Sequence, residues 1–450
     1  MFASTSISAA ANVSLLLSVM ISLLIYHSVF VGVAFTQFQL FSPHIDRQPS
    51  TTLKLSSAPN DELTESKSWR RHALEQLWEE RAKMGRTPVF PFKYTGNPRV
   101  TLLFKNETAT STGSLKHRYA WALMTWALLE GHVKQGTHVY EASSGNTAAS
   151  LAFMCRLIGV PFTAIVPDTL EDVKKEHIEH YGGQIVKVPI AERLVKAREL
   201  ADKSNGFFMN QFGNAFLAEE FHESGNYEKQ SANMFHEIVT QLNESRLAIP
   251  DYFVHAAGTG GTITSIGRYI KKYNLDTQVV FADTQFSVYY DYVLHNRFAN
   301  QSGSHLWVEP GMAGIGFGPM GPAKKGQTTS LDPAVIDRVL KIPDCASTAA
   351  MKVLLENGVS GGTSSGVNLV AALHIGANLS SPRPVTIATI LGDPSSYYQT
   401  SYLNRDWIAQ RFARHGGLEA YYCWISVLRE ALDNGKDPLQ LGRRCPTGNV

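Results

Sequence analysis

Short apolar runs alternate with helical stretches from about residue 98 onward, and this alternation constrains the fold more than any other feature of the chain. The runs lie at 100–104, 138–142, 162–166, 185–188, 252–256, 279–282 and 385–390. Strands that are separated by helices pair in parallel, and the helices then cover both faces of the sheet. We therefore expect an α/β fold with parallel sheets.

Composition excludes several classes of protein. The chain has 450 residues, of which 44% are hydrophobic and 18% are charged, as in a globular protein long enough for two or three domains. A net charge of +2 without a long basic run gives no indication of a nucleic-acid partner. The four cysteines are too scattered for a metal site, and a bridge between Cys423 and Cys445 is conceivable only in an oxidising compartment.

Residues 13–35 form an almost uncharged stretch of about the length that spans a bilayer. We interpret residues 1–40 as a membrane anchor or a signal segment. A cleaved signal is the alternative because Gly32-Val33-Ala34 offers small residues for processing, and an incorrect start site is a third. Arg47 and Lys54 follow the stretch and nothing charged precedes it, which favours a single-pass anchor with a cytosolic catalytic part. The alternative places that part outside the cytosol after cleavage.

The next segments are read from their polarity. Residues 41–67 are polar and lack an apolar period, so we interpret them as a linker. A helix is expected from Ser68 because apolar side chains recur on one face from Trp69 to Trp78. The catalytic region would then span 68–412. For the tail, 413–450, we predict only an additional helix.

One lysine stands where a turn meets an apolar helix. Ser111-Thr112-Gly113-Ser114-Leu115 precedes Lys116, and an apolar run begins at Tyr119. A poorly solvated amine loses its proton more easily, and the neutral amine can form a Schiff base with an aldehyde cofactor. Taken alone, the stretch fits an ordinary helix start equally well.

Three further Gly- and Ser-rich turns precede predicted helices. Residues 141–147 suit a carboxylate, and residues 258–262, Gly-Thr-Gly-Gly-Thr, suit a phosphate. The latter turn lacks the ending of a nucleoside-triphosphate loop and the spacing of a dinucleotide loop. Residues 360–366 could present a serine hydroxyl to a heteroaromatic nitrogen. Each turn alone could also be a plain structural turn or helix cap.

A lysine of this kind, a phosphate turn and an anion turn on one α/β scaffold together fit pyridoxal 5'-phosphate. From about residue 98 to 407 the chain resembles the cysteine synthase/cystathionine β-synthase family of fold-type-II pyridoxal-phosphate enzymes. Its motifs at 111–118, 141–147, 287–292 and 402–407 are most similar to the L-cysteine desulfhydrase branch. The resemblance implies a tryptophan synthase β-like fold with two three-layer α/β/α domains and the cofactor in the cleft between them. It also implies a small domain at about 135–215 inserted in the large one, and a homodimer.

The resemblance assigns roles by position. Lys116 would link to the cofactor and act as the catalytic base, and Asn146 would contact the phenolic oxygen. The phosphate would be held by Gly258, Thr259, Gly260, Gly261 and Thr262, and the pyridine nitrogen would meet Ser364. The substrate would be bound by Ser143, Ser144, Thr147, Gln211 and Gly314.

The reaction is expected from the residue at the ring nitrogen. A neutral serine hydroxyl does not keep that nitrogen protonated, which disfavours transamination and favours loss of a β-substituent. We expect β-elimination on L-cysteine that releases sulfide, pyruvate and ammonia. The enzymatic alternatives are cysteine synthase, which adds sulfide to O-acetylserine, and a serine or threonine dehydratase. The remaining alternative is a catalytically silent membrane-tethered relative that acts as a sensor or binding partner.

Departures from the cysteine synthase motifs bear on the substrate more than on the cofactor. His117 replaces an Asp that follows the lysine, and Ala148 replaces a Gly. The segment Gly392-Asp393-Pro394-Ser395-Ser396-Tyr397 replaces the usual Ser-Gly-Glu-Arg-Tyr.

Overall fold

A computed structural model describes residues 60–143, 145–223, 233–298, 311–318 and 329–447. The predicted anchor or signal segment 1–40, the apolar stretch 13–35, Ser144 and the linker up to residue 59 lie outside these residues. The described helices include none with the length and apolar character needed to cross a membrane.

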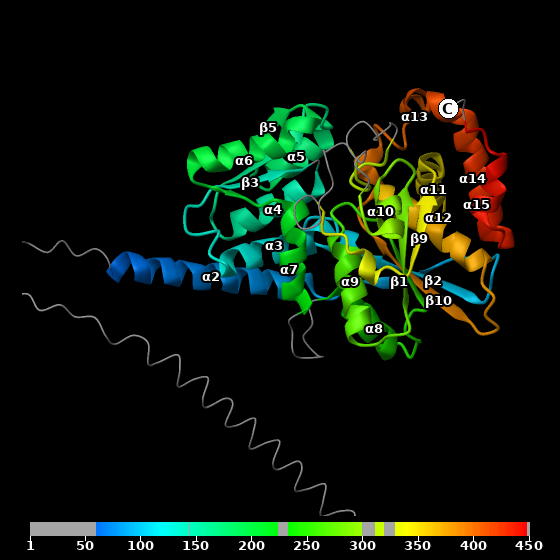
Figure 1. The fold of residues 1–450 in the computed structure, drawn as a ribbon, viewed down its shortest axis with the longest axis horizontal. Helices are drawn as coiled ribbons and strands as arrows, with labels where there is room; N and C mark the ends of the chain where they lie inside the picture. Colours follow the sequence, from blue (N-terminus) through cyan, green and yellow to red (C-terminus); the bar gives the residue numbers. More distant parts are fainter. Residues whose placement is uncertain (1–59, 144, 224–232, 299–310, 319–328, 448–450) are drawn as a thin grey trace, which may run out of the picture. The chain divides into compact units, whose positions relative to one another are not determined.

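Two sheets organise the described chain (Figure 1). The six-stranded sheet has the order β1-β2-β10-β7-β8-β9, and the four-stranded sheet has the order β5-β4-β3-β6. All neighbours pair in parallel except β1 and β2. The strands are β1 (Val89–Phe92), β2 (Val100–Asn106), β3 (Val139–Ala142), β4 (Phe162–Pro167), β5 (Gln184–Val188), β6 (Phe207–Phe208), β7 (Tyr252–His255), β8 (Gln278–Thr284), β9 (Arg338–Ile342) and β10 (Val385–Leu391).

Helices separate most of the strands. They are α2 (Asn60–Met84), α3 (Lys116–Leu129), α4 (Asn146–Leu157), α5 (Asp172–His180), α6 (Arg193–Ser204), α7 (Gln211–Glu223), α8 (Met234–Glu244), α9 (Gly261–Lys272), α10 (Tyr289–His295), α11 (Asp344–Glu356), α12 (Thr363–Ala377), α13 (Arg405–Arg411), α14 (Gly417–Asn434) and α15 (Pro438–Leu441). Short 3-10 turns follow β2 and precede α6 (Glu107–Ala109 and Ile190–Glu192).

The expected α/β architecture with parallel sheets is confirmed, and each predicted strand is present. Helix α2 begins at Asn60, however, and not at Ser68 as expected. Residues 60–67 carry no apolar period, so the criterion of a recurring apolar face could not identify them as helical.

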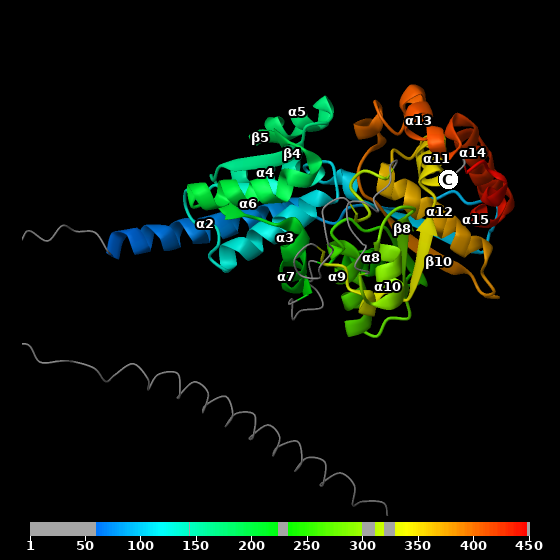
Figure 2. The same cartoon turned by 45° about the horizontal axis from the view of Figure 1, so that its top comes forward.

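Apolar side chains fill separate cores on the two faces of each sheet. One face of the large sheet packs on α11 and α12, and its other face packs on α8 and α9. In the small sheet, α3 and α4 cover one face of β3 and β4, and α6 covers the other. Figure 2 shows α11, α12 and α14 together at the large sheet. Because the strands of each sheet other than β1 run parallel, the loops that follow them gather at one edge of the sheet, where the strands' carboxyl ends lie.

The C-terminal segment belongs to the core of the large sheet. Helix α14 packs against α11 and buries Trp424 and Leu428, which join the same cluster as the α12 side chains. Cys423 and Cys445 form a disulfide, with their Cα atoms 5.6 Å apart. The two remaining cysteines, Cys155 and Cys345, are free and buried.

Candidate active site

A cavity of about 630 Å³ lies among the loops that follow β3, β7 and β10. This position agrees with the general rule that α/β sheets bind ligands at the carboxyl ends of their strands. Most residues that sequence motifs singled out line the cavity. These are Lys116, Ser143, Asn146, Thr147, Gln211, Gly258, Thr259, Gly260, Thr262, Gly314 and Ser364.

Lys116 is the first residue of α3 and is half-buried at the cavity wall. Its Nζ lies 5.4 Å from the ring centroid of Tyr119, one turn further along the helix. The preceding residue, Leu115, donates its backbone N–H to Gly392 O at 2.7 Å. The loop after β10 therefore holds the start of α3 in place.

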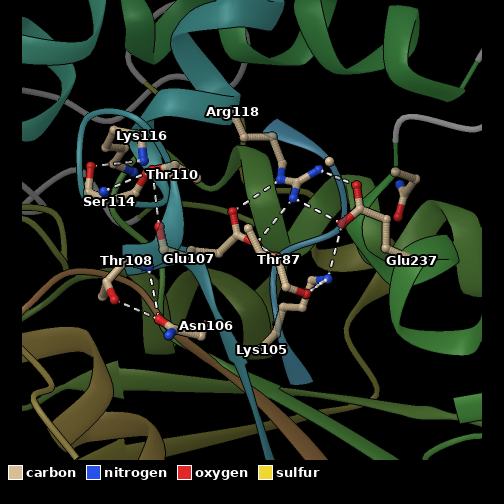
Figure 3. A network of polar contacts seen from close by, with 12 residues as sticks. Thr87, Lys105, Asn106, Glu107, Thr108, Thr110, Ser114, Lys116, Arg118 and Glu237 are labelled. Atoms are coloured by element: carbon tan, nitrogen blue, oxygen red, sulfur yellow. Dashed lines mark hydrogen bonds and ion pairs between the residues drawn. The ribbon is translucent and has the colours of Figure 1, made fainter. Parts of the chain in front are cut away.

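A buried network of charges anchors α3 just below Lys116 (Figure 3). Arg118 makes two contacts with Glu107, at 3.1 and 3.2 Å, and two with Glu237, at 2.7 and 3.1 Å. Lys105 Nζ and Arg81 Nη2 also contact the Glu237 carboxylate, at 3.0 and 2.7 Å. Bidentate hydrogen bonds between a guanidinium and a carboxylate are strong and directional. They therefore hold α2, β2, α3 and α8 in one arrangement.

A second contact ties α3 to α2. His117 is buried, and its Nε2 lies 2.9 Å from Glu80 Oε1. Ser111 Oγ donates to the same carboxylate oxygen at 2.7 Å. Glu80 thus holds both the turn before Lys116 and the helix after it. The motif residue His117 is part of the support beneath the lysine and does not line the cavity.

The glycine turn 258–262 leads into α9, whose N-cap Gly260 has φ 86°. A Cβ on Gly258 would collide with Gly314 O, and a Cβ on Gly260 would collide with the backbone of Leu331. The first amides of a helix have no intrahelical acceptor, and Thr262 and Ile263 from that turn line the cavity. A phosphate suits this end of the cavity because no acidic residue lies in the first turn of α9.

The turn that is predicted to bind a carboxylate lies at the start of α4. Ser143 Oγ accepts from the backbone N–H groups of Gly145 and Ala148, at 3.3 and 3.2 Å. Gln211 Nε2 donates to Ala142 O at 2.9 Å and to Glu141 at 3.3 Å. Gln211 would therefore have to exchange one of these acceptors for a substrate carboxylate. Burial raises the pKa of Glu141 to about 8, despite its hydrogen bonds with Gln211.

The segments that carry Ser364 and Gly314 also line the cavity and contact each other. Ser364 lies in the first turn of α12, and Gly392 packs against its hydroxyl so closely that a Cβ there would lie 2.8 Å from Oγ. Thr363 Oγ1 donates to Ala313 O at 2.8 Å, next to Gly314. Gly316 N donates to Ala257 O at 2.7 Å, so the 312–316 loop is joined to the glycine turn.

These residues fit pyridoxal phosphate. The glycine cradle admits no side chain, the helix start beside it suits an anion, and an amine lines the same cavity. Among the predicted site residues, Gly261 does not line the cavity, although it begins α9. Ser144 lies outside the described residues. The individual roles of all these residues remain predictions.

Several cavity residues were not singled out from the sequence. His255 ends β7 and is buried, and both burial and the charge of Lys116 lower its pKa to about 3, so the ring is neutral at physiological pH. Lys174 enters from α5 and pairs with Glu171 at 2.8 Å. Asp393 and Tyr398 follow β10. The sequence did contain one indication that His255 and Asp393 belong to the site, because each lies at or just after the end of a predicted strand.

Comparison with known proteins agrees with this geometry. Residues 81–390 match the model of the family described as pyridoxal-phosphate dependent enzyme. A Caenorhabditis elegans protein described as pyridoxal-phosphate dependent is 46% identical over 410 residues, which cover 88% of this chain and 94% of that protein. The L-cysteine desulfhydrase Cds1 of Mycobacterium tuberculosis is 30% identical over 351 residues, which cover 76% of this chain and 90% of that enzyme.

A solved structure shows the same fold. The crystal structure of O-ureido-L-serine synthase matches with a TM-score of 0.59 and 23% identity, over 72% of this chain and 94% of that one. With the family match over most of the chain and the site geometry, the conclusion is that this chain belongs to the family of pyridoxal-phosphate dependent enzymes.

Proposed function

We propose that the enzyme eliminates the thiol of L-cysteine. In this reaction one cysteine and one water give one sulfide, one pyruvate and one ammonia. The printed name of the M. tuberculosis relative and the motifs shared with the desulfhydrase branch support this assignment. The observation that carries it is that Lys116 and Ser364 line one cavity together with the glycine turn of α9.

Each residue is given a role in this proposal. Thr262 and the glycine turn hold the phosphate, Asn146 meets the phenolic oxygen, and Ser364 meets the ring nitrogen. The substrate carboxylate is bound by Ser143, Ser144, Thr147 and Gln211, and the Gly314 loop closes the amino-group side. When bound, pyridoxal phosphate would supply an electron sink for the pair left at the substrate Cα when its proton is removed.

Lys116 then moves the proton that the reaction requires. Its amine takes the proton from the substrate Cα, and the cavity wall keeps it close to that atom. The neutral His255 ring beside it carries no competing positive charge. A serine at position 364 leaves the ring nitrogen without a carboxylate partner, which favours prompt loss of the β-substituent.

The proposal is tested with the full chain loaded with pyridoxal phosphate. Sulfide and pyruvate release from L-cysteine alone is compared with cysteine formation from O-acetylserine and sulfide. We expect sulfide and pyruvate in equal amounts, at a rate above that of the replacement reaction. A replacement rate far above the elimination rate would identify a cysteine synthase and overturn the proposal.

Two lysine variants control this assay. Lys116→Ala should lose the visible absorbance of the bound cofactor and reduce sulfide release by at least about 10²-fold. Lys203→Ala removes an exposed lysine of α6 and should leave both signals unchanged. Elimination at wild-type rate in Lys116→Ala would exclude Lys116 as the base.

We also propose a homodimer and attachment to a membrane through residues 13–35. Family resemblance supports the dimer. For residues 13–35, the Cys423–Cys445 disulfide favours the alternative to an anchor. In that alternative the segment is a cleaved signal and the enzyme reaches an oxidising compartment. Light scattering of the purified chain tests the first proposal. The N-terminal sequence of the mature protein and its resistance to carbonate extraction separate anchor from signal.

A further inference from the structure

Asp393 lies where the parts of the site meet. It follows β10, and its neighbour Gly392 accepts from Leu115 N, next to Lys116. Asp393 O accepts from Gly362 N at 2.9 Å, just before the helix that carries Ser364. The residue is 5% exposed and lines the cavity. The proposed function assigns it no role.

The carboxylate makes two hydrogen bonds through one oxygen. Asn146 Nδ2 donates to Asp393 Oδ2 at 2.8 Å, and the Tyr398 hydroxyl donates to the same oxygen at 2.6 Å. The other oxygen, Oδ1, is buried and has no hydrogen-bond partner among the described residues. A Cβ on Gly362 would collide with Oδ1, so glycine at 362 leaves room for the carboxylate.

Asp393 therefore fixes which way the Asn146 amide faces. An amide has a donating and an accepting end, and the carboxylate selects the Nδ2 end. Nδ2 carries two hydrogens, so a second one can be directed to a ligand while the first remains on Asp393. Loss of the carboxylate would remove this preference and leave the amide free to rotate.

Two lysines act on the Asp393 carboxylate, Lys174 and Lys116. Burial raises the pKa of Asp393, and the hydrogen bonds from Tyr398 and Asn146 and the charges of Lys174 and Lys116 counteract the rise. Burial and the charge of Asp393 together raise the pKa of Tyr397 and of Tyr398. Proton binding at Asp393 is thus coupled to Lys116.

We propose that Asp393 is a positioning residue that acts through Asn146, holding the amide in the orientation that donates to the phenolic oxygen of the bound cofactor. The proposal rests on the cofactor role assigned to Asn146 under the proposed function. The Gly392 to Tyr397 segment, where this chain departs from the cysteine synthase motif, then has a definite task. It supplies the carboxylate that orients the amide.

The test uses the full chain with pyridoxal phosphate and no amino-acid substrate, so that it does not depend on the reaction catalysed. The dissociation constant of the cofactor and the pH midpoint of its visible absorbance are measured. Asp393→Ala should weaken cofactor binding about tenfold, because partners in direct contact are strongly coupled. Asp393→Asn keeps an acceptor oxygen and should weaken binding by less than about threefold.

The pH midpoint reports the charge. A carboxylate favours a proton on the nearby nitrogen of Lys116, so Asp393→Asn should move the midpoint to lower pH, by about one unit. Asp433→Asn removes an exposed carboxylate of α14 and should change neither measurement. An unchanged midpoint in Asp393→Asn would show that no such charge acts at the cofactor and would overturn the electrostatic part.

A double-mutant cycle tests the route through Asn146. If Asp393 acts through that amide, Asp393→Ala should weaken binding by less than twofold in an Asn146→Ala background. An equal, tenfold loss in both backgrounds would overturn the proposal. So would an unchanged dissociation constant in Asp393→Ala. Thermal unfolding of each variant distinguishes a local loss from a failure to fold, and Asp393→Asn provides the measurement if Asp393→Ala does not fold.

Discussion

Glycine is required at two positions of the turn 258–262, Gly258 and Gly260. At Gly258 a side chain would meet the backbone oxygen of Gly314, and at Gly260 it would meet the backbone of Leu331. Gly260 also has φ 86°, in the left-handed region that other residues adopt at a cost. A substitution at Gly260 therefore adds a collision to a backbone penalty, and the two effects can be separated by comparison.

Gly260→Ala should destabilise the protein by more than the backbone penalty alone, which is about 1–2 kcal/mol. The excess arises because Leu331 and the turn must move apart, which also disturbs the amides that face the phosphate. We expect cofactor binding to weaken at least about tenfold. Urea unfolding gives the stability change, and titration with pyridoxal phosphate gives the affinity.

Gly136→Ala is the matched control for this prediction. Gly136 also has a positive φ, of 78°, but a Cβ there would meet nothing within 4 Å. Gly136→Ala should lower the free energy of unfolding by the backbone penalty alone and leave the cofactor affinity unchanged. Equal losses of stability and affinity in the two variants would mean that the collision at Leu331 has no effect.

At the scale of elements, α3 is held by residues that no local pattern reveals. Arg118 lies on α3, Glu107 follows β2, and Glu237 lies on α8, 119 residues from Arg118. Sequence motifs identified Lys116 because its turn is local. The supporting pairs could not be predicted, because buried charges far apart in sequence have no characteristic spacing.

Glu237→Gln should destabilise the protein by about 3–5 kcal/mol, because it removes one of two carboxylates from a buried cluster that holds three cations. Glu244→Gln changes the last residue of the same helix, whose carboxylate pairs with Arg86 at the surface. Glu244→Gln should lower the free energy of unfolding by only a small fraction of that amount. Guanidinium unfolding of both measures the difference, and similar losses would contradict a special role for the buried cluster.

The same carboxylate predicts a pH dependence. Burial alone would raise the pKa of Glu237, but the charges of Arg118, Lys105 and Arg81 and the hydrogen bond from Arg118 together outweigh burial and lower it from 4.5 to about 2. The unfolded chain then binds the proton more readily than the folded one, so this part of the stability is complete above about pH 4.5 and disappears toward pH 2. Glu237→Gln should remove that component from the acid limb of a stability profile.

The sequence pattern identified the buried strands and the edge strand β5, and it missed the strands with a weaker apolar signal. The central strands β2, β7, β8 and β10 were predicted because buried parallel strands are continuously apolar. Three strands were missed. β1 contains Pro91 and lies at an edge, β9 carries Arg338 and Lys341 at the other edge, and β6 has two residues. Edge strands tolerate proline and polar residues, so their signal is weaker.

For the whole molecule, the C-terminal segment is the largest difference from expectation. The additional helix predicted in the tail is present as α14, but its packing over α11 and the contribution of Trp424 to the core were not predicted. Amphipathic spacing indicates a helix but not its docking partner. The cavity was better predicted, because the motifs around Lys116, Asn146, Gly258 and Ser364 each mark the end of a strand or the start of a helix.

The disulfide at this end of the chain leads to a prediction about all four cysteines. Cys155 and Cys345 are buried, and burial raises the pKa of both thiols, that of Cys345 to about 12. A thiol reagent should therefore label none of the cysteines in the native enzyme. After unfolding without reductant it should label the two free cysteines, and all four only after reduction.

Mass spectrometry of the labelled protein checks these numbers, and peptide mapping should recover Cys423 linked to Cys445. Because the bond closes a loop across a separation of 22 residues, reduction should lower the free energy of unfolding by about 3 kcal/mol. Cys423→Ser is the control, and unfolding it without reductant should label Cys445 as well. If all four cysteines of the unfolded wild-type protein reacted without reductant, Cys423 and Cys445 would not be bonded. Helix α14 would then be held only by its packing against α11.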